Sequence, residues 1–460
     1  MKQYSTFHFS AYSWNHHAGK ISLKYSLDNK LHFEELIFLP EPISDERLEE
    51  KKWEIERLLF ALHMIGGISY FKTCLPRSIK IESGDLDSHE ARFWNTVYEK
   101  GLGEFFFKNN IDFRGLINFP ATRSKPLLTP AMRKKPAVNP LKRILVPIGG
   151  GKDSMVTIEQ LRKTDADITL LRLEPHPIID ELSHAAGLPM MTVRRQLSPT
   201  LFDLNDDGAL NGHVPITAYL SILTTLMAVL YDYDAVAMSN ERSANVGNVE
   251  FKGLMVNHQW SKSVEFERML RKYITDAVMT NTEYFSALRP YSELRIAQIF
   301  SLYPEYFARV TSCNKNWKIL SSPLPAAPQS RGEGPGVRAW CGTCPKCAFV
   351  FATMAAFLDK EDLLTMFGTN LFEDESLIPL FEELLGVKNF KPFECVGTPE
   401  ETKAAFLLAH RCGELTNTPV MKMFESTVLK TIDDPDTLIA VTLASHGEHF
   451  IPAPFQPAFL

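Results

Sequence analysis

Short apolar runs alternate with longer helical stretches through the middle of the chain. These runs do not alternate polar with apolar side chains, which is typical of strands buried on both faces of a parallel sheet. The runs are RILVPI from residue 143, DITLLRL from 167, MMTVRR from 190 and AVAMS from 235. Helices are expected between them, ending near residues 163 and 187, and then from Pro215 to Tyr231. The order predicts βαβ units, and therefore an α/β domain with a doubly wound parallel sheet over residues 143–310.

The first 118 residues follow a different pattern, which predicts an N-terminal α+β domain. Residues 20–27 alternate strictly, Asp28 and Asn29 supply turn chemistry, and residues 31–39 form the expected return strand. Helical spacing then runs from Ile55 to Met64 and stops at two glycines.

Residues 119–142 have no period and contain five prolines and a basic run at 133–135. Proline at this density does not continue a helix or an inner strand, so the segment is predicted to be a linker. Its charges fit either a solvated linker or an arm that helps to hold a polyanionic substrate.

The last hundred residues, 359–460, are predicted to form a mostly helical C-terminal domain. A clear helix start lies at Thr398, with a capping hydroxyl, Pro399 at the first helical position and Glu401 three residues after the cap. Between this region and the α/β domain, residues 311–358 form a separate cysteine-bearing segment.

Composition and charge narrow the class of protein. The chain is 45% apolar and 23% charged with a formal net charge of -6, which describes an ordinary globular protein and disfavours broad coating of nucleic acid. The first residues do not resemble a signal peptide, and the apolar runs are well below the roughly 18 residues of a membrane span. A cytoplasmic protein with reduced or metal-bound cysteines is expected.

A glycine-rich stretch follows the first of the apolar runs. Gly149, Gly150 and Gly151 precede Lys152, Asp153 and Ser154 at the expected start of a helix. Backbone N–H groups there can approach an anion closely, so a phosphate is the expected guest. The spacing excludes a Walker A loop, because Asp153 separates lysine from serine, and also the dinucleotide G-x-G-x-x-G. A glycine-rich turn without a ligand is the alternative.

Four cysteines in the last third have the spacing of a metal site. Cys341, Cys344 and Cys347 form two successive C-x-x-C steps, and Cys313 lies upstream across a glycine-containing loop at 331–336. Four thiolates complete a tetrahedral set for a structural zinc ion. An iron–sulfur cluster or unligated thiols are the alternatives.

The glycine stretch resembles the pyrophosphate loop, SGGxDS, of the ATP pyrophosphatase (PP-loop) superfamily. The resemblance implies that Ser154 and the glycine amides hold pyrophosphate, that Lys152 offsets its charge, and that Asp153 orients the loop or Mg²⁺. Gly149 departs from the motif, because a serine usually stands there. With the four cysteines the chain is also similar to 7-cyano-7-deazaguanine synthases, but those enzymes are about half its length.

The whole chain looks like the bacterial UDP-N-acetylmuramoyl-L-alanyl-L-glutamate epimerase family. The resemblance rests on the glycine stretch, SNERSANVGN at 239–248, NHQWSKSVEFE at 257–267, WCGTCPKC at 340–347 and the long flanks. It implies that ATP activates the terminal L-glutamate of a UDP-linked muramoyl dipeptide as an acyl adenylate. AMP and pyrophosphate are released and the glutamate is inverted.

The groups that move the α-proton are not fixed by the motifs. Asp153, Glu241, His213 and Lys262 are the candidate catalytic residues, because they lie near the ligand crevice expected at the carboxyl ends of the strands. His258 is a further candidate, and each of them has a plain structural role as its alternative.

Three more candidates concern binding and proton transfer. Arg242 and Lys252 are candidates for binding substrate carboxylates or phosphates, beside Asn248. Cys395 and Cys412 form either a proton-transfer pair or two inert thiols.

Two other functions remain open from the residues alone. One is another adenylating enzyme of the same superfamily, acting on a tRNA base or a deazapurine carboxylate. The other is a non-catalytic module that binds nucleotide and zinc. The net charge of -6 gives no support to a tRNA partner.

Overall fold

The computed structural model describes residues 4–124, 141–313, 315 and 340–460. Most of the predicted linker, including its basic run, lies outside these residues, as does the glycine-containing loop at 331–336.

One sheet of nine strands organises the chain. Its middle strands run parallel, in the order β11, β8, β5, β6, β7. They are β5 (Arg143–Pro147), β6 (Asp167–Leu173), β7 (Met190–Gln196), β8 (Ala235–Met238) and β11 (Glu283–Ser286). From β5 the chain adds β6 and β7 on one side and then β8 and β11 on the other, so the order reverses between β5 and β8. Ligands bind at such a reversal, outside the carboxyl ends of the strands.

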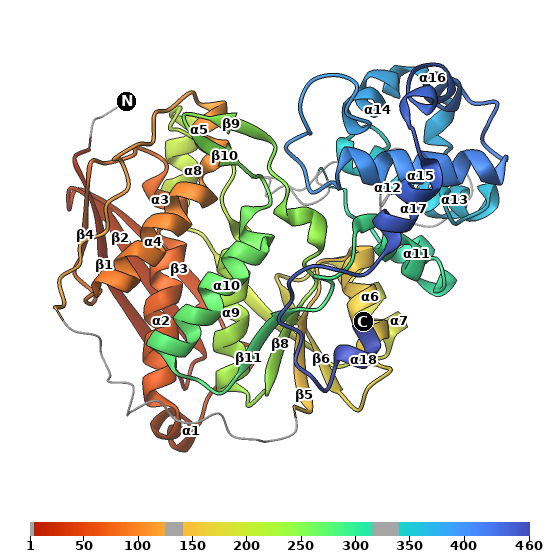
Figure 1. Ribbon diagram of the computed structural model, residues 1–460. Helices are drawn as coiled ribbons and strands as arrows, with labels where there is room; N and C mark the ends of the chain where they lie inside the picture. Colours follow the sequence, from red (N-terminus) through yellow and green to blue (C-terminus); the bar gives the residue numbers. More distant parts are fainter. Residues whose placement is uncertain (1–3, 125–140, 314, 316–339) are drawn as a thin grey trace.

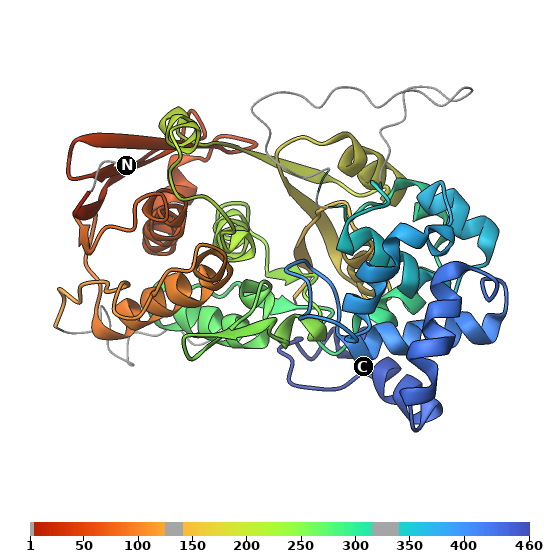
Figure 2. The same ribbon diagram turned by 90° about the horizontal axis from the view of Figure 1, so that it is seen from above.

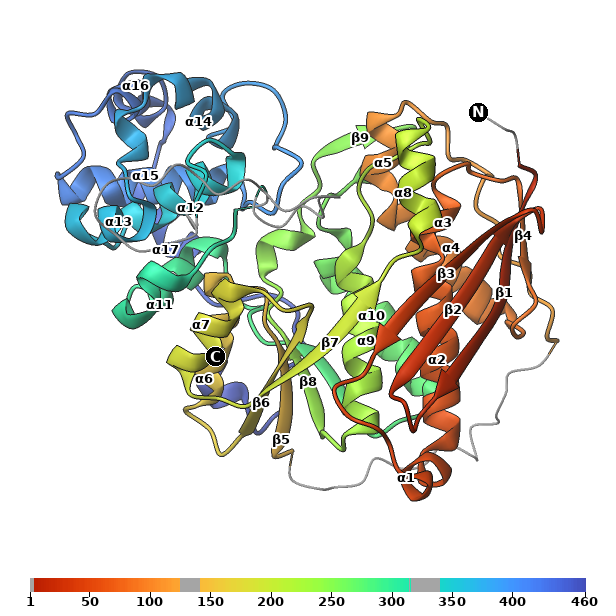
Figure 3. The same cartoon turned by 180° about the vertical axis from the view of Figure 1, so that it is seen from behind.

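The N-terminal strands extend the same sheet. Strand β3 pairs antiparallel with β7, as Figure 3 shows from behind. The strands are β1 (Thr6–Asn15), β2 (Lys20–Leu27), β3 (Leu31–Phe38) and β4 (Ser78–Ile81). The predicted hairpin at residues 20–39 is confirmed, and both turn residues, Asp28 and Asn29, have positive φ angles of 52° and 51°. A separate two-stranded ribbon joins β9 (Val249–Phe251) to β10 (Leu254–Val256).

Helices pack on both faces of the nine-stranded sheet. The first half of the chain contributes α1 (Asp45–Glu50), α2 (Lys52–Gly66), α3 (Ile68–Phe71), α4 (Ser88–Gly101) and α5 (Gly103–Lys108). The middle contributes α6 (Lys152–Leu161), α7 (Pro177–Ala186), α8 (Pro199–Asp206), α9 (Ile216–Leu230), α10 (Val264–Tyr273) and α11 (Glu293–Phe300). Helices α2 and α9 lie side by side against one face (Figure 1).

The C-terminal region is helical, as predicted. It contains α12 (Pro345–Ala355), α13 (Lys360–Phe367), α14 (Ile378–Leu384), α15 (Pro399–Cys412), α16 (Pro419–Thr427), α17 (Pro435–Leu443) and α18 (Gln456–Phe459). The capping box predicted at Thr398 and Glu401 is present at the start of α15. Figure 2 shows this region and the N-terminal strands on opposite sides of the parallel strands. None of the helices in the described ranges combines the length and apolar character that a membrane crossing needs.

Two hydrophobic cores lie on opposite faces of the sheet. Ile144 and Val146 of β5 belong to the core shared with the C-terminal helices, whereas Leu145 belongs to the core shared with the N-terminal helices. All three are fully buried, because successive strand residues point to opposite faces and both faces are covered. Strands β5 and β8 are therefore almost wholly apolar, which is the pattern that the sequence displayed, whereas β7 carries Arg194, Arg195 and Gln196 and is only partly buried.

Candidate active site

The glycine loop connects β5 to α6 at the reversal of strand order. Gly150 has a φ of 80°, and Gly151 is the N-cap residue directly before α6. A side chain on Gly151 would meet the Ser312 hydroxyl at 2.9 Å, so only glycine fits there without a shift. The Ser154 hydroxyl donates a hydrogen bond to the Gly151 carbonyl at 3.0 Å. The structure therefore places the predicted phosphate loop at a helix N-terminus.

Four ionic side chains form a group beneath this loop, which we call the loop cluster: Lys152, Asp153, Glu293 and Lys346. The Lys152 ammonium is 1% exposed, contacts the Glu293 carboxylate and lies 2.6 Å from Asp153 Oδ1. The Lys346 ammonium lies 3.2 Å from the other Glu293 oxygen. Although burial opposes the negative charge of Glu293, the neighbouring ammoniums hold the pKa of Glu293 below its ordinary value. Two cations and two carboxylates thus balance one another in a buried site.

The four predicted metal ligands come together. Their sulfurs lie within 4.8 Å of one another, with Cys341 Sγ and Cys344 Sγ at 3.7 and 3.4 Å from Cys347 Sγ. Tetrahedral Zn–S bonds of about 2.3 Å place sulfurs about 3.8 Å apart, so the thiols fit a zinc ion. This site adjoins the loop cluster, since Lys346 lies between two of its cysteines.

A backbone contact also connects the cysteine segment to the glycine loop. The Thr311 N–H, two residues before Cys313, donates to the Gly150 carbonyl at 2.8 Å. The cysteine segment is therefore attached directly to the glycine loop.

Glu241 is a buried carboxyl for which the described part of the chain supplies no hydrogen-bond partner. It follows β8 and is 1% exposed, and neither carboxylate oxygen has a partner among the residues that the structure describes. Burial raises the pKa of Glu241, and the Lys262 ammonium opposes that rise. Burial lowers the pKa of Lys262, but the charges of Cys395 and Glu241 raise it above its ordinary value overall. Lys262 is the strongest charged neighbour of both Glu241 and Cys395.

A second polar group, the thiol cluster, contains Glu104, His213, His258 and Cys395. His258 Nδ1 lies 2.5 Å from Glu104 Oε2, and His213 Nδ1 lies 3.5 Å from the same oxygen. Lys108 contacts the other Glu104 oxygen at 2.5 Å. Burial raises the pKa of Glu104, but the hydrogen bond from His258 and the surrounding cations lower it to about 2. Glu104 is therefore a carboxylate at neutral pH.

His258 and Cys395 form a hydrogen-bonded pair with opposite pKa shifts. Burial lowers the pKa of His258, but its hydrogen bonds to Cys395 and Glu104 raise it to about 9. Burial raises the pKa of Cys395, but the Lys262 charge and the hydrogen bond from His258 lower it to about 6. Both shifts favour the charged form of the pair, a thiolate beside an imidazolium ion. Burial and the His258 charge lower the pKa of His213 to about 3, so that ring is neutral.

Three side-chain contacts hold the segment that carries Cys395. Asn248 Nδ2 donates to the carbonyls of Lys391 and Pro392 at 3.1 and 2.9 Å, and Gln259 Nε2 donates to that of Val396 at 3.1 Å. The same Asn248 accepts from the His258 N–H at 2.8 Å. The contacts place Cys395 and His258 on one scaffold.

Other residues singled out in the sequence lie elsewhere. Arg242 donates to the carbonyls of Pro290, Ala444 and Thr442, and so attaches the C-terminal region to the loop after β8. Lys252 lies in the tight turn between β9 and β10. Cys412 is exposed at the end of α15.

The relation between the two cysteines follows from the length of α15. The helix has 14 residues and is about 20 Å long, and Cys395 precedes its start. The two cysteines are not a pair.

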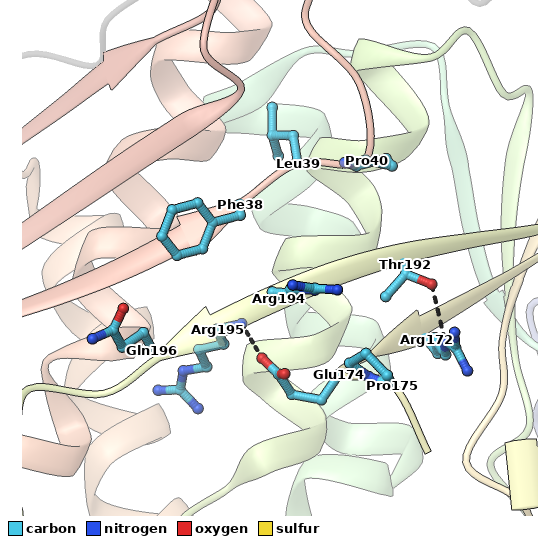
Figure 4. Close-up of a pocket in the computed structure, with 10 residues that line it drawn as sticks. All are labelled: Phe38, Leu39, Pro40, Arg172, Glu174, Pro175, Thr192, Arg194, Arg195 and Gln196. Carbon is cyan, nitrogen blue, oxygen red and sulfur yellow. Dashed lines mark hydrogen bonds between the residues drawn. The ribbon is translucent and has the colours of Figure 1, made fainter. Parts of the chain in front are cut away.

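A pocket of about 700 Å³ lies apart from both clusters, where β3 meets β7 (Figure 4). Its charges are largely matched: Arg172 contacts Thr192 and Asp180, and the Glu174 carboxylate accepts from the Arg195 N–H. It contains none of the groups suited to proton transfer that line the clusters.

The fold and the clusters define an α/β protein whose buried acids, bases and glycine loop meet where the strand order reverses. The model of the MurL N-terminal domain matches residues 1–287, and that of the MurL C-terminal domain matches residues 309–437. The chain belongs to the MurL family, and the resemblance drawn from its motifs is confirmed.

Curated relatives carry the name UDP-N-acetyl-alpha-D-muramoyl-L-alanyl-L-glutamate epimerase. The one from Xanthomonas oryzae pv. oryzae is 36% identical over 451 residues, covering 98% of this chain and 96% of its own. The one from Micromonospora sp. is 35% identical over 469 residues, covering 100% of this chain and 98% of its own. The likeness extends through both flanks, so Glu104 and Cys395 lie inside the matched regions.

Sequence reasoning missed three residues of the two clusters: Glu104, Glu293 and Lys346. Glu293 had a weak signal, an acidic residue directly after Ser292 at a helix start. Lys346 lies inside the cysteine motif, where a buried lysine is unusual. Glu104 had no signal, because only the packing of α5 brings it to His258.

Proposed function

We propose that the protein is an ATP-dependent epimerase. It converts the terminal L-glutamate of UDP-N-acetylmuramoyl-L-alanyl-L-glutamate to D-glutamate and releases AMP and diphosphate, in the cytoplasm. The names of the full-length relatives support the substrate. The observation that carries the proposal is the glycine loop at the reversal of strand order, directly above a buried ionic cluster and beside an unpartnered carboxyl.

The need for ATP follows from the acidity of the substrate. The α-proton of a carboxylate is hard to remove, because the carbanion would lie beside an existing negative charge. Joining the carboxylate to AMP removes that charge, so the α-proton becomes much more acidic. A base then removes the proton, its return from the opposite face inverts the centre, and water releases AMP.

The loop residues have roles in the activating step. The amides of Gly149, Gly150 and Gly151 and the Ser154 hydroxyl hold the departing diphosphate, as in the PP-loop type of ATP pyrophosphatase fold. Lys152 fixes Asp153 at the helix start, where Asp153 binds Mg²⁺ or orients the loop.

The remaining groups have roles in structure and proton transfer. Cys313, Cys341, Cys344 and Cys347 hold a structural zinc ion, which would fix the position of Lys346. Glu241 handles a proton, Lys262 stabilises the negative charge that develops on the substrate, and neutral His213 supports the thiol cluster.

The test measures two partial reactions with the purified protein. With ATP and the UDP-linked L-glutamyl dipeptide, labelled diphosphate should exchange into ATP, and in deuterated water the glutamate should gain deuterium at its α-carbon. A deazapurine carboxylate and tRNA serve as competing substrates. No diphosphate exchange with the dipeptide, from protein with a cooperative thermal transition, would refute the proposal, as would exchange that depends on a competing substrate instead.

A further inference from the structure

The thiol cluster contains a chain of three groups from distant parts of the sequence. Glu104 lies on α5, His258 follows β10, and Cys395 lies between α14 and α15. His258 Nδ1 lies 2.5 Å from Glu104 Oε2, and the Cys395 thiol is a hydrogen-bonding neighbour of the same imidazole. A carboxylate that orients an imidazole, which in turn holds a nucleophile or base, is a common catalytic arrangement.

Three cationic side chains favour the thiolate form of Cys395. Lys262 and His258 are its strongest cationic neighbours, and Lys346 of the loop cluster adds a third positive charge. Glu394 is the adjacent carboxyl, and burial raises its pKa, which weakens its negative charge. Cys395 as a residue is partly exposed.

A second, independent feature points to a substrate beside this group. Glu241 is 1% exposed and both its oxygens lack a partner among the described residues, although Lys262 is a close cation that it shares with Cys395. An unpartnered buried carboxyl is costly to keep, unless a ligand or a proton completes it. Inversion needs two proton-transfer groups, one for each face of the α-carbon.

We propose that Cys395 is a catalytic residue that exchanges the α-proton of the activated glutamate, with His258 and Glu104 as positioning residues and Glu241 as the group serving the opposite face. This inference rests on the proposed function.

The proton balance is simple. The Cys395 thiolate takes the α-proton, so an S–H bond forms while the C–H bond breaks, and the electron pair moves to the acyl oxygen as an enolate. The enolate then takes a proton from the Glu241 carboxyl on its other face, and a C–H bond forms again. The Lys262 ammonium stabilises the enolate, and solvent afterwards removes the proton from sulfur and restores the one on Glu241.

The decisive experiment separates activation from proton transfer in the variant Cys395→Ser. We expect diphosphate exchange into ATP to stay within about threefold of wild type. We expect deuterium incorporation at the α-carbon to fall by about 10²–10⁴-fold, the usual contribution of a positioned acid or base. Cys412→Ser, at the exposed end of α15, is the matched control and should leave both reactions unchanged.

The outcomes distinguish this inference from the proposed function. Deuterium incorporation near the wild-type rate in Cys395→Ser would overturn the inference. Loss of both reactions would also overturn it, because it would assign Cys395 to activation. Absence of substrate-dependent diphosphate exchange in the wild type would instead refute the proposed function.

Alkylation tests the positioning residues without relying on turnover. In a Cys412→Ser background, iodoacetamide should modify Cys395 with a half-maximal rate near pH 6, read by mass spectrometry of the peptide. The alkylated protein should retain diphosphate exchange and lose deuterium incorporation. In His258→Gln the half-maximal pH should rise toward the ordinary thiol value of about 8.5. An unchanged pH profile of alkylation in His258→Gln would overturn the positioning roles of His258 and Glu104.

Discussion

The loop cluster and the thiol cluster are both buried and polar, but their charges are arranged differently. In the loop cluster each cation contacts a carboxylate, and Glu293 contacts two ammoniums. Around the thiol cluster, Lys262, His258 and Lys346 act on Cys395, and Glu241 has no hydrogen-bond partner within the described ranges. A balanced set of charges fixes geometry, whereas an unbalanced set shifts pKa values and prepares groups to exchange protons.

The difference suggests a division of labour between the two clusters. Under the proposed function, the loop cluster would position the phosphates of ATP for activation, and the thiol cluster would move the proton that activation makes acidic. Lys262 and Lys346 influence both, so the two steps share one electrostatic environment.

Loss of the metal should have the largest effect, because it removes the support of the loop cluster. In Cys347→Ser one of four thiolates is missing, and a structural zinc contributes about 10–16 kcal/mol in zinc-finger peptides. We expect no bound zinc, a clearly lower Tm and loss of both partial reactions, measured by elemental analysis, calorimetry and the exchange assays. Cys412→Ser should retain the metal. Wild-type diphosphate exchange in a zinc-free Cys347→Ser protein would show that the loop cluster does not need the metal.

Removal of the Lys152 ammonium from the loop cluster should have the second-largest effect. Lys152→Met leaves Glu293 and Asp153 short of a partner, which typically costs about 3–5 kcal/mol for a buried pair. We expect the free energy of unfolding in urea to fall by that amount, and diphosphate exchange to fall about 10²–10³-fold. Deuterium incorporation should fall in parallel, because activation comes first. Lys163→Met, at an exposed position two residues after the end of the same helix, is the control.

The pH dependence of stability tests a buried carboxyl near Glu293 of the loop cluster. Burial raises the pKa of Glu401 to about 7, although the Ser243 hydroxyl donates to it. The folded state therefore binds this proton more tightly than the unfolded state, so stability is highest below about pH 4.5 and falls as pH rises to about 7.

The variant Glu401→Gln keeps a capping side chain and removes the titration. Between pH 5 and pH 8 the free energy of unfolding in urea should fall by on the order of 3 kcal/mol in the wild type. The variant should not show this fall. An identical difference in both proteins would place the titrating group elsewhere.

The smallest effect is expected at the irregular position of the loop. A side chain on Gly149 would meet nothing within 4 Å, so Gly149→Ser should change the free energy of unfolding by less than about 0.5 kcal/mol. Diphosphate exchange should stay within about twofold or rise, because the added hydroxyl matches the superfamily motif. A severe loss would mean that the glycine itself is required. Gly151→Ser is the contrasting variant, since its side chain meets Ser312.

The sequence determined the features that depend on local pattern. The parallel strands were recognisable because both faces are apolar, the hairpin because of its turn residues, and α15 because of its cap. The glycine loop and the four cysteines were also readable, since phosphate and metal binding each need a fixed spacing along the chain.

Only the tertiary structure decided which side chains meet across the chain. Glu104, His258 and Cys395 are separated by more than a hundred residues each, and no spacing rule connects them. The tertiary structure also decided that the N-terminal strands continue the parallel sheet through an antiparallel pairing of β3 with β7. The periodicity of the sequence does not predict this pairing. The chemistry of Glu104, His258 and Cys395 depends on burial and on neighbouring charges, and both arise only when three regions of the chain pack together.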